Sequence, residues 1–581
     1  MSKEKNKKTK DNSSYFRNII FIELISAVLS TVFCINFAAD ISLLAFPLAL
    51  IFTGLTVYFA FFKMLKNQDG NYCFKSLKFI QYLPFVHLLT FILRRAGKNG
   101  TPLWFDWITV ILWLVMFFGS FVAAKPLSDK KIKETTKNWK IPKEKYTKPA
   151  GALRVLYEVI DWVDALIQAV FIVLIFQIFI IQLYEIPSES MVPTFLKKDR
   201  VLVTKFDCGP KFPLTDVGLP DFRKYKKGDT VVLRNPHYSM DRKSEVKSVT
   251  SQLVYMLTFM SVNLNKDENG QQKADPLVKR IAALPGEQIV MQDGVLYYRT
   301  KNNSAFQPSV MDGQYAVWNL SEKKSQLGNS VETYPLSSSD YETMINLEEQ
   351  RRNYDLKSAE NTINQNIEII SALISDDSFD GEFNIPSNDI RNLFSNVYVM
   401  ANDVLTKNGG FKWFKDFSSS WIASIDAERD MYAEANYRLN VMTKVAFSNL
   451  IKECAVALKN NSLSSVSESK IFSENAELAE KLIWYVQGQL DQRNMPLFPA
   501  NDSNGNPQYI PENCYFMMGD NRFNSLDLRH SYDYAPKPLT SSDSLSVEYY
   551  SNMEPQYINK KYVIGKAVFR FWPMNRISRV R

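Results

Sequence analysis

Two serines follow a long apolar run of the sequence, in the segment EIPSESMVPTF at residues 185–195. A serine hydroxyl is a weak nucleophile until a neighbouring base accepts its proton and hydrogen-bond donors stabilise the oxyanion that it creates. Few residues could serve as a histidine base, because the chain has only three histidines: His87, His237 and His530. Ser188 and Ser190 are therefore candidates for nucleophilic chemistry in which another side chain acts as the base.

The stretch PLVKRIAALPGE, residues 276–287, supplies a lysine that could be this base. Burial disfavours the charged form of a lysine and lowers its pKa, so that the neutral amine becomes available. Lys279 follows two apolar residues, Leu277 and Val278, on a predicted strand. Its neighbour Arg280 would point to the opposite face of the strand and stay charged. The alternative is that both are surface cations on an edge strand.

A polar loop in the segment CYFMMGDNRFNSLDLRHS, residues 514–531, is the third candidate. It follows an apolar strand and turns at residues 519–521. An ion pair between Asp527 and Arg529 could fix the loop, and the Ser525 hydroxyl could orient an amine. Taken alone, the segment could equally be a solvated surface loop.

Four motifs occur in one order after the last apolar run: SESMVPT, KKGDTVVLRNP, PLVKRIAALPGE and MMGDNRFNSLDLR. This set resembles the bacterial type I signal peptidase family, also called leader peptidase, whose members use a serine–lysine dyad. The resemblance covers about residues 185–237, 276–299 and 508–580. The eukaryotic endoplasmic-reticulum relatives carry a histidine where Lys279 stands, so this sequence is similar to the bacterial type.

The resemblance gives the motif residues roles by their positions. It implies that Ser190 is the nucleophile and that Lys279 is the general base. It also implies that the Ser188 hydroxyl and the Ser190 backbone N–H form the oxyanion hole. Ser525 resembles the serine that positions the lysine amine.

The polar loop resembles the family pattern with one departure, and another departure lies between the two serines. Asp527 and Arg529 take the place of the family's structural ion pair. Leu528 replaces the usual serine between them, and we expect it to point away from the pair. Glu189 fills the variable place between the serines, and we expect it to face solvent.

The resemblance also implies a substrate, a pre-protein held in the membrane by its signal peptide. Its cleavage region would carry small residues at the −1 and −3 positions, which fit shallow apolar pockets. We expect six residues to wall these pockets: Ile186, Pro187, Met191, Phe195, Leu277 and Val278. The implied reaction requires no metal ion and no organic cofactor.

The charge of the chain indicates a membrane partner. The net charge of +8 comes largely from two basic stretches, KEKNKKTK at 3–10 and KKIKETTKNWKIPKEKYTK at 130–148. Neither stretch is interleaved with aromatic residues as a nucleic-acid groove would be. We expect as partners signal-peptide-bearing pre-proteins, the lipid membrane and the secretion machinery, and no nucleic acid.

Long apolar runs crowd the first part of the 581 residues. A helix of about 20 apolar residues crosses a membrane. Four runs are long enough, at about 18–38, 41–62, 103–124 and 163–184, and a fifth at 79–93 is shorter. The positive-inside rule places both basic stretches in the cytoplasm, so an even number of spans must separate them. We therefore expect 79–93 to cross as well, which gives five spans.

With five spans, the last one starts in the cytoplasm and delivers the serine segment to the opposite face. We therefore expect a multi-pass protein of the bacterial cytoplasmic (inner) membrane. Its catalytic domain would lie on the extracytoplasmic side.

The pattern of the chain changes after the last span. Short β-branched runs with turn signals, such as Asp293-Gly294, predict strands, whereas apolar residues at three- and four-residue spacing predict helices over about 340–495. We predict a mixed fold: a multi-span α-helical membrane anchor, then an all-β catalytic domain of the signal peptidase and self-cleaving repressor type with a large α-helical insertion. The predicted regions are an N-terminal transmembrane region at 1–125, a basic cytoplasmic linker at 126–162, the final transmembrane helix at 163–184, the β domain at 185–300 and 508–581, and the mainly helical insertion at 301–507.

We consider three candidate functions for this sequence. The first is a membrane-bound serine endopeptidase that removes signal peptides from exported pre-proteins. The second is a self-cleaving repressor, against which the apolar spans and the lack of a DNA-binding helix pair argue. The third is a non-catalytic membrane scaffold that retains the peptidase fold. A scaffold has no reason to keep five chemistry-bearing residues together: Ser188, Ser190, Lys279, Ser525 and Asp527.

Overall fold

The chain divides into two compact units, which are described separately. The first holds residues 1–183, 204–223 and 238–275, and the second holds 184–203, 224–237 and 276–581. The computed structural model describes residues 12–35, 42–97, 101–127, 139–140, 151–239, 241–258, 261–266, 270, 273–374 and 379–580. The two basic stretches expected in the cytoplasm lie outside the described residues, apart from Trp139 and Lys140.

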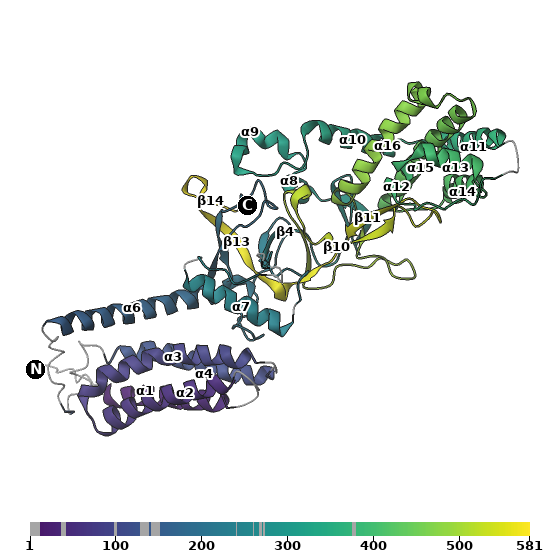
Figure 1. Ribbon diagram of the computed structural model, residues 1–581. Helices are drawn as coiled ribbons and strands as arrows, with labels where there is room; N and C mark the ends of the chain where they lie inside the picture. The colour runs from purple at the N-terminus through teal and green to yellow at the C-terminus, as the bar shows by residue number, and fades with distance from the viewer. Residues whose placement is uncertain are drawn as a thin grey trace, which may run out of the picture. The chain divides into compact units, whose positions relative to one another are not determined.

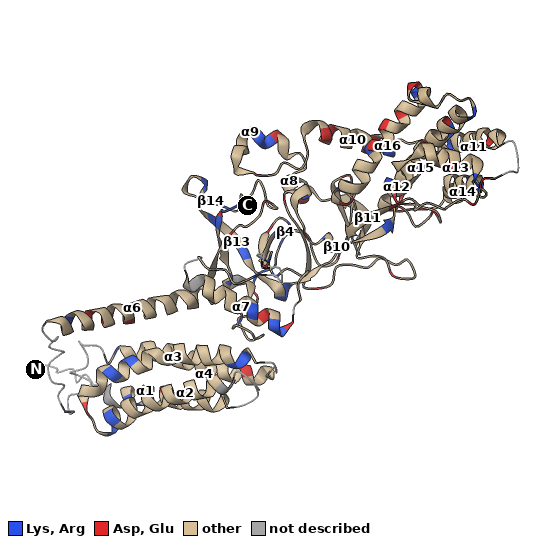
Figure 2. Ribbon diagram, viewed as in Figure 1, with Lys and Arg blue, Asp and Glu red and all other residues tan. Residues whose placement is uncertain are grey.

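Apolar helices make up most of the first unit (Figure 1). Within the described ranges, five helices are long and apolar enough to cross a membrane. Figure 2 shows that charged residues on α1 to α4 gather towards the helix ends. The helices of this unit are α1 (Asn12–Phe33), α2 (Ser42–Val57) with its π-helical continuation Tyr58–Lys66, α3 (Cys73–Arg95), α4 (Leu103–Ala124), α6 (Ala152–Phe179) and α7 (Arg242–Leu257).

Two of these helices differ in extent from the predicted runs. The run at 79–93 is part of the longer helix α3, which removes the objection that it is too short to cross. The helix expected at 163–184 begins earlier, at Ala152, and ends at Phe179. Its last expected residues instead form strand β1 (Ile181–Glu185). An apolar run suits a buried helix and a buried strand equally well, so hydrophobicity could not locate this change.

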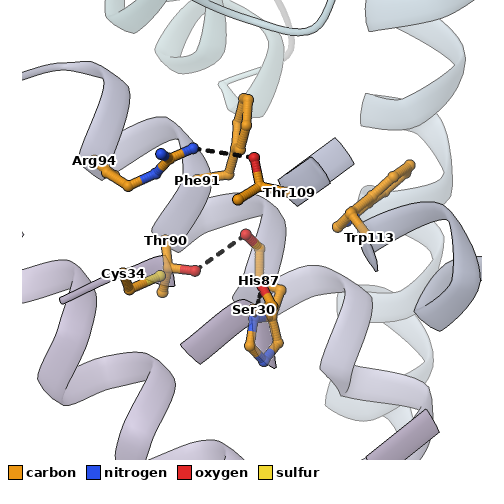
Figure 3. Close-up of a pocket in the computed structure, with 8 residues that line it drawn as sticks. All are labelled: Ser30, Cys34, His87, Thr90, Phe91, Arg94, Thr109 and Trp113. Atoms are coloured by element: carbon orange, nitrogen blue, oxygen red, sulfur yellow. Dashed lines mark hydrogen bonds between the residues drawn. The ribbon is translucent and has the colours of Figure 1, made fainter. Parts of the chain in front are cut away.

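Polar side chains of the first unit form hydrogen bonds and ion pairs between its helices. His87 of α3 bonds to Ser30 at 2.9 Å and to Thr53 at 3.1 Å. The buried Arg94 lies 3.3 Å from Asp106. A cavity of about 10 Å³ lies among these groups (Figure 3), which is room for about one water molecule. Pairing of this kind is needed where the surroundings are apolar, because unpaired polar groups are costly there.

A curled antiparallel sheet organises the second unit. Among the described residues its strand order is β1-β2-β13-β3-β4-β9-β12, with β14 paired to β13. On the interior strand β4, Lys279 lies opposite Val231 of β3 and Arg280 lies opposite Met518 of β9. The alternative of two surface cations on an edge strand is therefore wrong. The strands after β1 are β2 (Arg200–Thr204), β3 (Thr230–Leu233), β4 (Leu277–Ala283), β9 (Cys514–Met518), β12 (Ile558–Asn559), β13 (Val563–Trp572) and β14 (Ser578–Arg579).

A smaller sheet follows the sequence pattern closely. Its order in the described residues is β7-β6-β5-β8, formed by β5 (Glu287–Gln292), β6 (Val295–Thr300), β7 (Asn303–Pro308) and β8 (Met495–Phe498). The predicted turn at Asp293-Gly294 is confirmed, since Gln292 pairs with Val295 and both turn residues have positive φ. A separate hairpin pairs β10 (His530–Pro538) with β11 (Glu548–Met553).

The chain between β7 and β8 is mainly helical, and α15 runs through the middle of its helices (Figure 1). Asp430 caps the start of α15 by accepting the N–H of Ala433, and Phe447 of α15 packs with Phe417 in the core. The predicted fold class is thus confirmed. The helices are α8 (Val310–Tyr315), α9 (Lys324–Leu327), α10 (Ser338–Arg352), α11 (Leu356–Leu373), α12 (Ile390–Ser395), α13 (Val397–Thr406), α14 (Gly410–Ser419), α15 (Met431–Lys459), α16 (Lys470–Gly488) and α17 (Leu490–Arg493).

Candidate active site

Ser190 and Lys279 meet in the second unit, although they are 89 positions apart in the chain. Lys279 Nζ donates a hydrogen bond of 2.9 Å to Ser190 Oγ. Lys279 comes from the interior strand β4 and is 2% exposed, and Ser190 comes from the loop after β1 and is 8% exposed. The contact is short enough for direct proton transfer between the hydroxyl and the amine.

The surroundings of Lys279 favour its neutral form. Burial lowers the pKa of Lys279 to about 8, although the charge of Asp527 acts to raise it. An exposed lysine has a pKa of about 10.4. A useful fraction of the amine is therefore neutral near neutral pH and can accept the Ser190 proton.

Asp527 and Arg529 form a fully buried ion pair beside this contact. Arg529 Nε donates to Asp527 Oδ1 at 2.8 Å. Asp527 Oδ2 accepts from the Ser525 hydroxyl at 2.8 Å and from the Gly519 N–H at 2.9 Å. Burial acts to raise the pKa of the Asp527 carboxyl, but Arg529 outweighs burial and holds that pKa below its ordinary value. The positive charge of Arg529 thus balances the Asp527 carboxylate, and Asp527 does not form an ion pair with Lys279.

The two remaining predicted serines occupy different positions. Ser188 is exposed, and its Oγ donates to Ser190 Oγ at 3.3 Å. Ser525 is buried and directs its hydroxyl at Asp527. The structure therefore gathers Ser188, Ser190 and Lys279 in one group and places Ser525 in the ion-paired loop next to it.

Gly519 lies very close to both Ser190 and Ser525, which the sequence did not reveal. A Cβ atom at this position would lie 2.2 Å from Ser525 Oγ and 2.5 Å from the Ser190 carbonyl oxygen. Neither distance is possible between real atoms, so only glycine fits here. Sequence reasoning assigned this glycine to a turn, whereas its main requirement is space.

Glu189 contradicts its expected exposure. Its side chain is buried, and its carboxylate accepts the backbone N–H of Glu332 at 2.5 Å and that of Thr333 at 3.2 Å. The donors are backbone groups 143 and 144 positions away, which carry no signature in the sequence. The expectation that Glu189 faces solvent is therefore wrong.

A second ion pair near the site was also missed. Arg280 holds Asp520 with two hydrogen bonds of 2.8 Å, and its guanidinium also donates to Thr194 at 3.1 Å. Thr194 belongs to the segment that carries Ser190, so this network fastens that segment to strand β4. The adjacency of Arg280 to Lys279 was visible in the sequence, but its partner was not.

The residues expected to wall the substrate pockets differ in burial. Four of them, Ile186, Met191, Phe195 and Val278, are buried in one hydrophobic cluster. Pro187 is exposed and Leu277 is half-buried.

Metal-ligating residue types are dispersed over the chain. All five cysteines are free thiols. Among the residues that the structure describes, no group of three or more His, Cys, Asp or Glu side chains could hold a metal ion. The chemistry that the site geometry supports is proton transfer and nucleophilic attack by its own side chains.

Comparison with known proteins gives one family. Its sequence model, described as "Signal peptidase, peptidase S26", matches residues 159–337 and 456–572. A signal peptidase I from Buchnera aphidicola subsp. Schizaphis graminum is 38% identical over 78 residues, which are 13% of this chain and 25% of that protein. A signal peptidase I from Pseudomonas fluorescens is 32% identical over 77 residues, 13% of this chain and 27% of that protein. Signal peptidase I P from Bacillus subtilis subsp. natto is 25% identical over 143 residues, 25% of this chain and 52% of that protein.

These similarities are confined to parts of each protein. The matched segments span between about a quarter and about half of these relatives' lengths. No solved structure matches the chain. The family match omits residues 338–455, which hold α10 to α14 and most of α15. It includes Ser190, Lys279 and the Asp527 loop, and it extends over about half of the chain. With its apolar helices and this match, the chain is a membrane protein that belongs to the signal peptidase family, peptidase S26.

Proposed function

We propose that the chain is a membrane-bound serine endopeptidase that removes N-terminal signal peptides from exported pre-proteins. Ser190 is the nucleophile and Lys279 is the general base. The observation that carries this proposal is the 2.9 Å contact between Lys279 Nζ and Ser190 Oγ, with both side chains buried. The substrate class is supported by the names of the relatives, signal peptidase I.

Acylation follows from the geometry of the pair. Neutral Lys279 accepts the Ser190 proton as Ser190 Oγ attacks the carbonyl carbon of the scissile peptide bond. The Ser190 N–H and the Ser188 hydroxyl stabilise the oxyanion of the tetrahedral intermediate. Ser188 suits this role because its hydroxyl lies 3.3 Å from Ser190 Oγ and is exposed towards an incoming substrate.

Lys279 then completes acylation as a general acid and acts as the base again in deacylation. Protonated Lys279 donates its proton to the leaving amine as the C–N bond breaks, which leaves an acyl ester on Ser190. Lys279, neutral again, removes a proton from water, and the resulting hydroxide attacks the ester and releases the carboxylate product. Lys279 returns this proton to Ser190 Oγ as the ester C–O bond breaks, so water is the only co-reactant consumed.

The Asp527 loop supports these steps. In this proposal Ser525, held by Asp527, positions the Lys279 amine, and the Asp527–Arg529 pair fixes the loop. Six residues, expected from the sequence, border the pockets for the small −1 and −3 side chains: Ile186, Pro187, Met191, Phe195, Leu277 and Val278.

The membrane arrangement is part of the proposal. Five helices of suitable length in the described ranges support a multi-pass protein with five spans. We place it in the bacterial cytoplasmic membrane, with the regions given in the sequence analysis except that the last span is helix α6 (Ala152–Phe179). The catalytic domain faces the extracytoplasmic side, where the cleavage sites of pre-proteins delivered by the secretion machinery emerge.

The test uses the full chain purified in detergent or vesicles and a pre-protein with a small-x-small cleavage site. The parent should release the mature protein, with the new N-terminus identified by mass spectrometry. Ser190→Ala and Lys279→Ala should lose cleavage while keeping the parent's melting temperature within a few degrees. Cleavage by either variant at the parent's rate would contradict the assignment, and an inactive parent would favour the non-catalytic scaffold.

A further inference from the structure

A segment at the start of the predicted insertion packs against the nucleophile loop. We call residues 317–334 the strap. The Val317 N–H donates to Asp520 O at 2.8 Å. Val331 and Leu320 of the strap share a hydrophobic cluster with Val192 and Leu196, which lie in the same loop after the nucleophile. The strap therefore contacts the loop that carries Ser190 through apolar side chains, and its backbone bonds to Asp520 at the start of the neighbouring Asp527 loop.

Glu189 forms hydrogen bonds between the strap and this loop through its side chain. Its buried carboxylate accepts the N–H groups of Glu332 and Thr333 at 2.5 and 3.2 Å, with Asn524 Nδ2 at 3.5 Å. A buried charge is tolerated when it is hydrogen-bonded in this way. The strap also has an exposed attachment, because Lys197 Nζ lies 2.8 Å from Glu332 Oε1. The loop is thus held by one buried and one exposed charged contact.

The backbone next to Glu189 is fixed from the other side. The Asn521 side chain donates to Glu189 O at 3.2 Å, and the Asn521 N–H donates to Ser190 O at 3.1 Å. The peptide units of Glu189 and Ser190 therefore lie between the strap and the Asp527 loop. The side chain of Glu189 and the backbone that leads to Ser190 are therefore both held by hydrogen bonds.

We propose that Glu189 is a positioning residue whose carboxylate fastens the strap to the nucleophile loop and so keeps Ser190 Oγ within reach of Lys279. This inference rests on the proposed peptidase function. Glu189 takes no part in proton transfer, because its two carboxylate oxygens bind N–H groups of the strap. In this proposal the strap stabilises the position of the nucleophile.

Three variants of the full chain test the inference. Glu189→Ala removes both acceptors, and Glu189→Gln keeps the size of the side chain but leaves one acceptor oxygen and turns an amide N–H towards the strap donors. Lys197→Ala is the matched control, because it removes the exposed charged contact of the same strap. The readouts are kcat and KM with a signal-peptide substrate, the melting temperature, and backbone hydrogen exchange of the peptide around Glu332 and Thr333.

The expected result separates the buried contact from the exposed one. Glu189→Ala should lower kcat by about 10- to 100-fold, the range expected when a reacting group is misplaced by about 1 Å. KM should stay near that of the parent, exchange at Glu332 and Thr333 should become faster, and Glu189→Gln should fall between. Lys197→Ala should match the parent in all readouts, since exposed ion pairs contribute little.

The opposite results would overturn the inference. These are a parent-like kcat in Glu189→Ala, or a lower kcat without faster exchange in the strap. If Glu189→Ala does not fold, Glu189→Gln decides by the same two readouts. An inactive parent is a different failure, because it refutes the proposed peptidase function, whereas a fully active parent with an active Glu189→Ala refutes only the positioning role.

Discussion

Among the described residues of the second unit, two buried lysines contact serines, and their surroundings differ. Lys279 lies 2.9 Å from Ser190 Oγ, and Lys444 of α15 lies 2.8 Å from Ser420 Oγ. Burial lowers the pKa of each lysine to about 8. Distance and burial alone therefore do not distinguish the proposed catalytic pair from the other one.

The carboxylate beside each lysine distinguishes them. Asp543 binds both members of the second pair. Its Oδ2 lies 2.6 Å from Lys444 Nζ, and its Oδ1 accepts a hydrogen bond from the Ser420 hydroxyl at 2.6 Å. At the proposed active site the corresponding charge, Asp527, is held by Arg529. The proposed catalytic pair is thus the serine–lysine contact whose neighbouring carboxylate is paired with an arginine instead of with the lysine.

The largest expected effect is on the rate of cleavage by Lys279→Met. Without a base, kcat/KM should fall by at least about 10⁴-fold, as when a member of a catalytic unit is removed. The melting temperature should equal or exceed that of the parent, because a poorly solvated amine with no ion-pair partner has been removed. Calorimetry together with the cleavage assay checks both parts, and a marked loss of stability would count against a free amine at this position.

The matched change in the other pair, Lys444→Met, should lower the stability and leave the rate of cleavage unchanged. It leaves the Asp543 charge buried without its cation, which should lower the free energy of unfolding by about 3–5 kcal/mol. The folded fraction should cleave at the parent's rate. Denaturant titration measures the loss, and a rate that fell with unchanged stability would show that the second pair has a catalytic part.

Arg529→Met tests whether the ion pair with Asp527 keeps Lys279 free. In the parent, cleavage should rise about tenfold per pH unit below the Lys279 pKa of about 8 and level off above it, because the neutral amine is the base. Removing Arg529 takes away a positive charge that lowers this pKa and leaves Asp527 to raise it. The midpoint of the pH–rate profile should therefore move to higher pH. An unchanged midpoint would contradict the comparison.

The smallest expected effect is that of Ser420→Ala. Asp543 keeps Lys444 and Asn440 as partners, so the loss is limited to the hydrogen bonds that the Ser420 hydroxyl makes with Asp543 and Lys444. The free energy of unfolding should fall by about 1–3 kcal/mol. Cleavage should not change, in contrast with Ser190→Ala, and equilibrium unfolding of both variants provides the measurement.

Local patterns predicted the parts of the fold that neighbouring residues determine. The two-residue turn at Asp293-Gly294 and the helical insertion follow from turn chemistry and apolar spacing. The change from helix to strand after Phe179 was missed, because residues 180–184 are apolar enough for either. Hydrophobicity reports burial more directly than it reports the type of element.

The candidate site was predictable where its residues lie within motifs. Ser190 and Lys279 were chosen from such motifs, and the structure brings them into contact. The contact of Glu189 with the strap was not predictable, because its partners are backbone N–H groups that any sequence supplies. The crowding at Gly519 was equally hidden, since it arises from the approach of two segments more than 300 positions apart.

Asp527 also has a consequence for the range of acidity in which the protein remains folded. Because folding lowers its pKa, its charged form stabilises the fold fully above the unfolded pKa of about 3.9, and this contribution declines as the pH falls further. Lys279 becomes neutral only as the pH approaches about 8. In the proposed mechanism, the loop that keeps Lys279 out of an ion pair would therefore restrict cleavage to neutral to alkaline surroundings, and acid would reduce the activity before it reduces the stability of the fold.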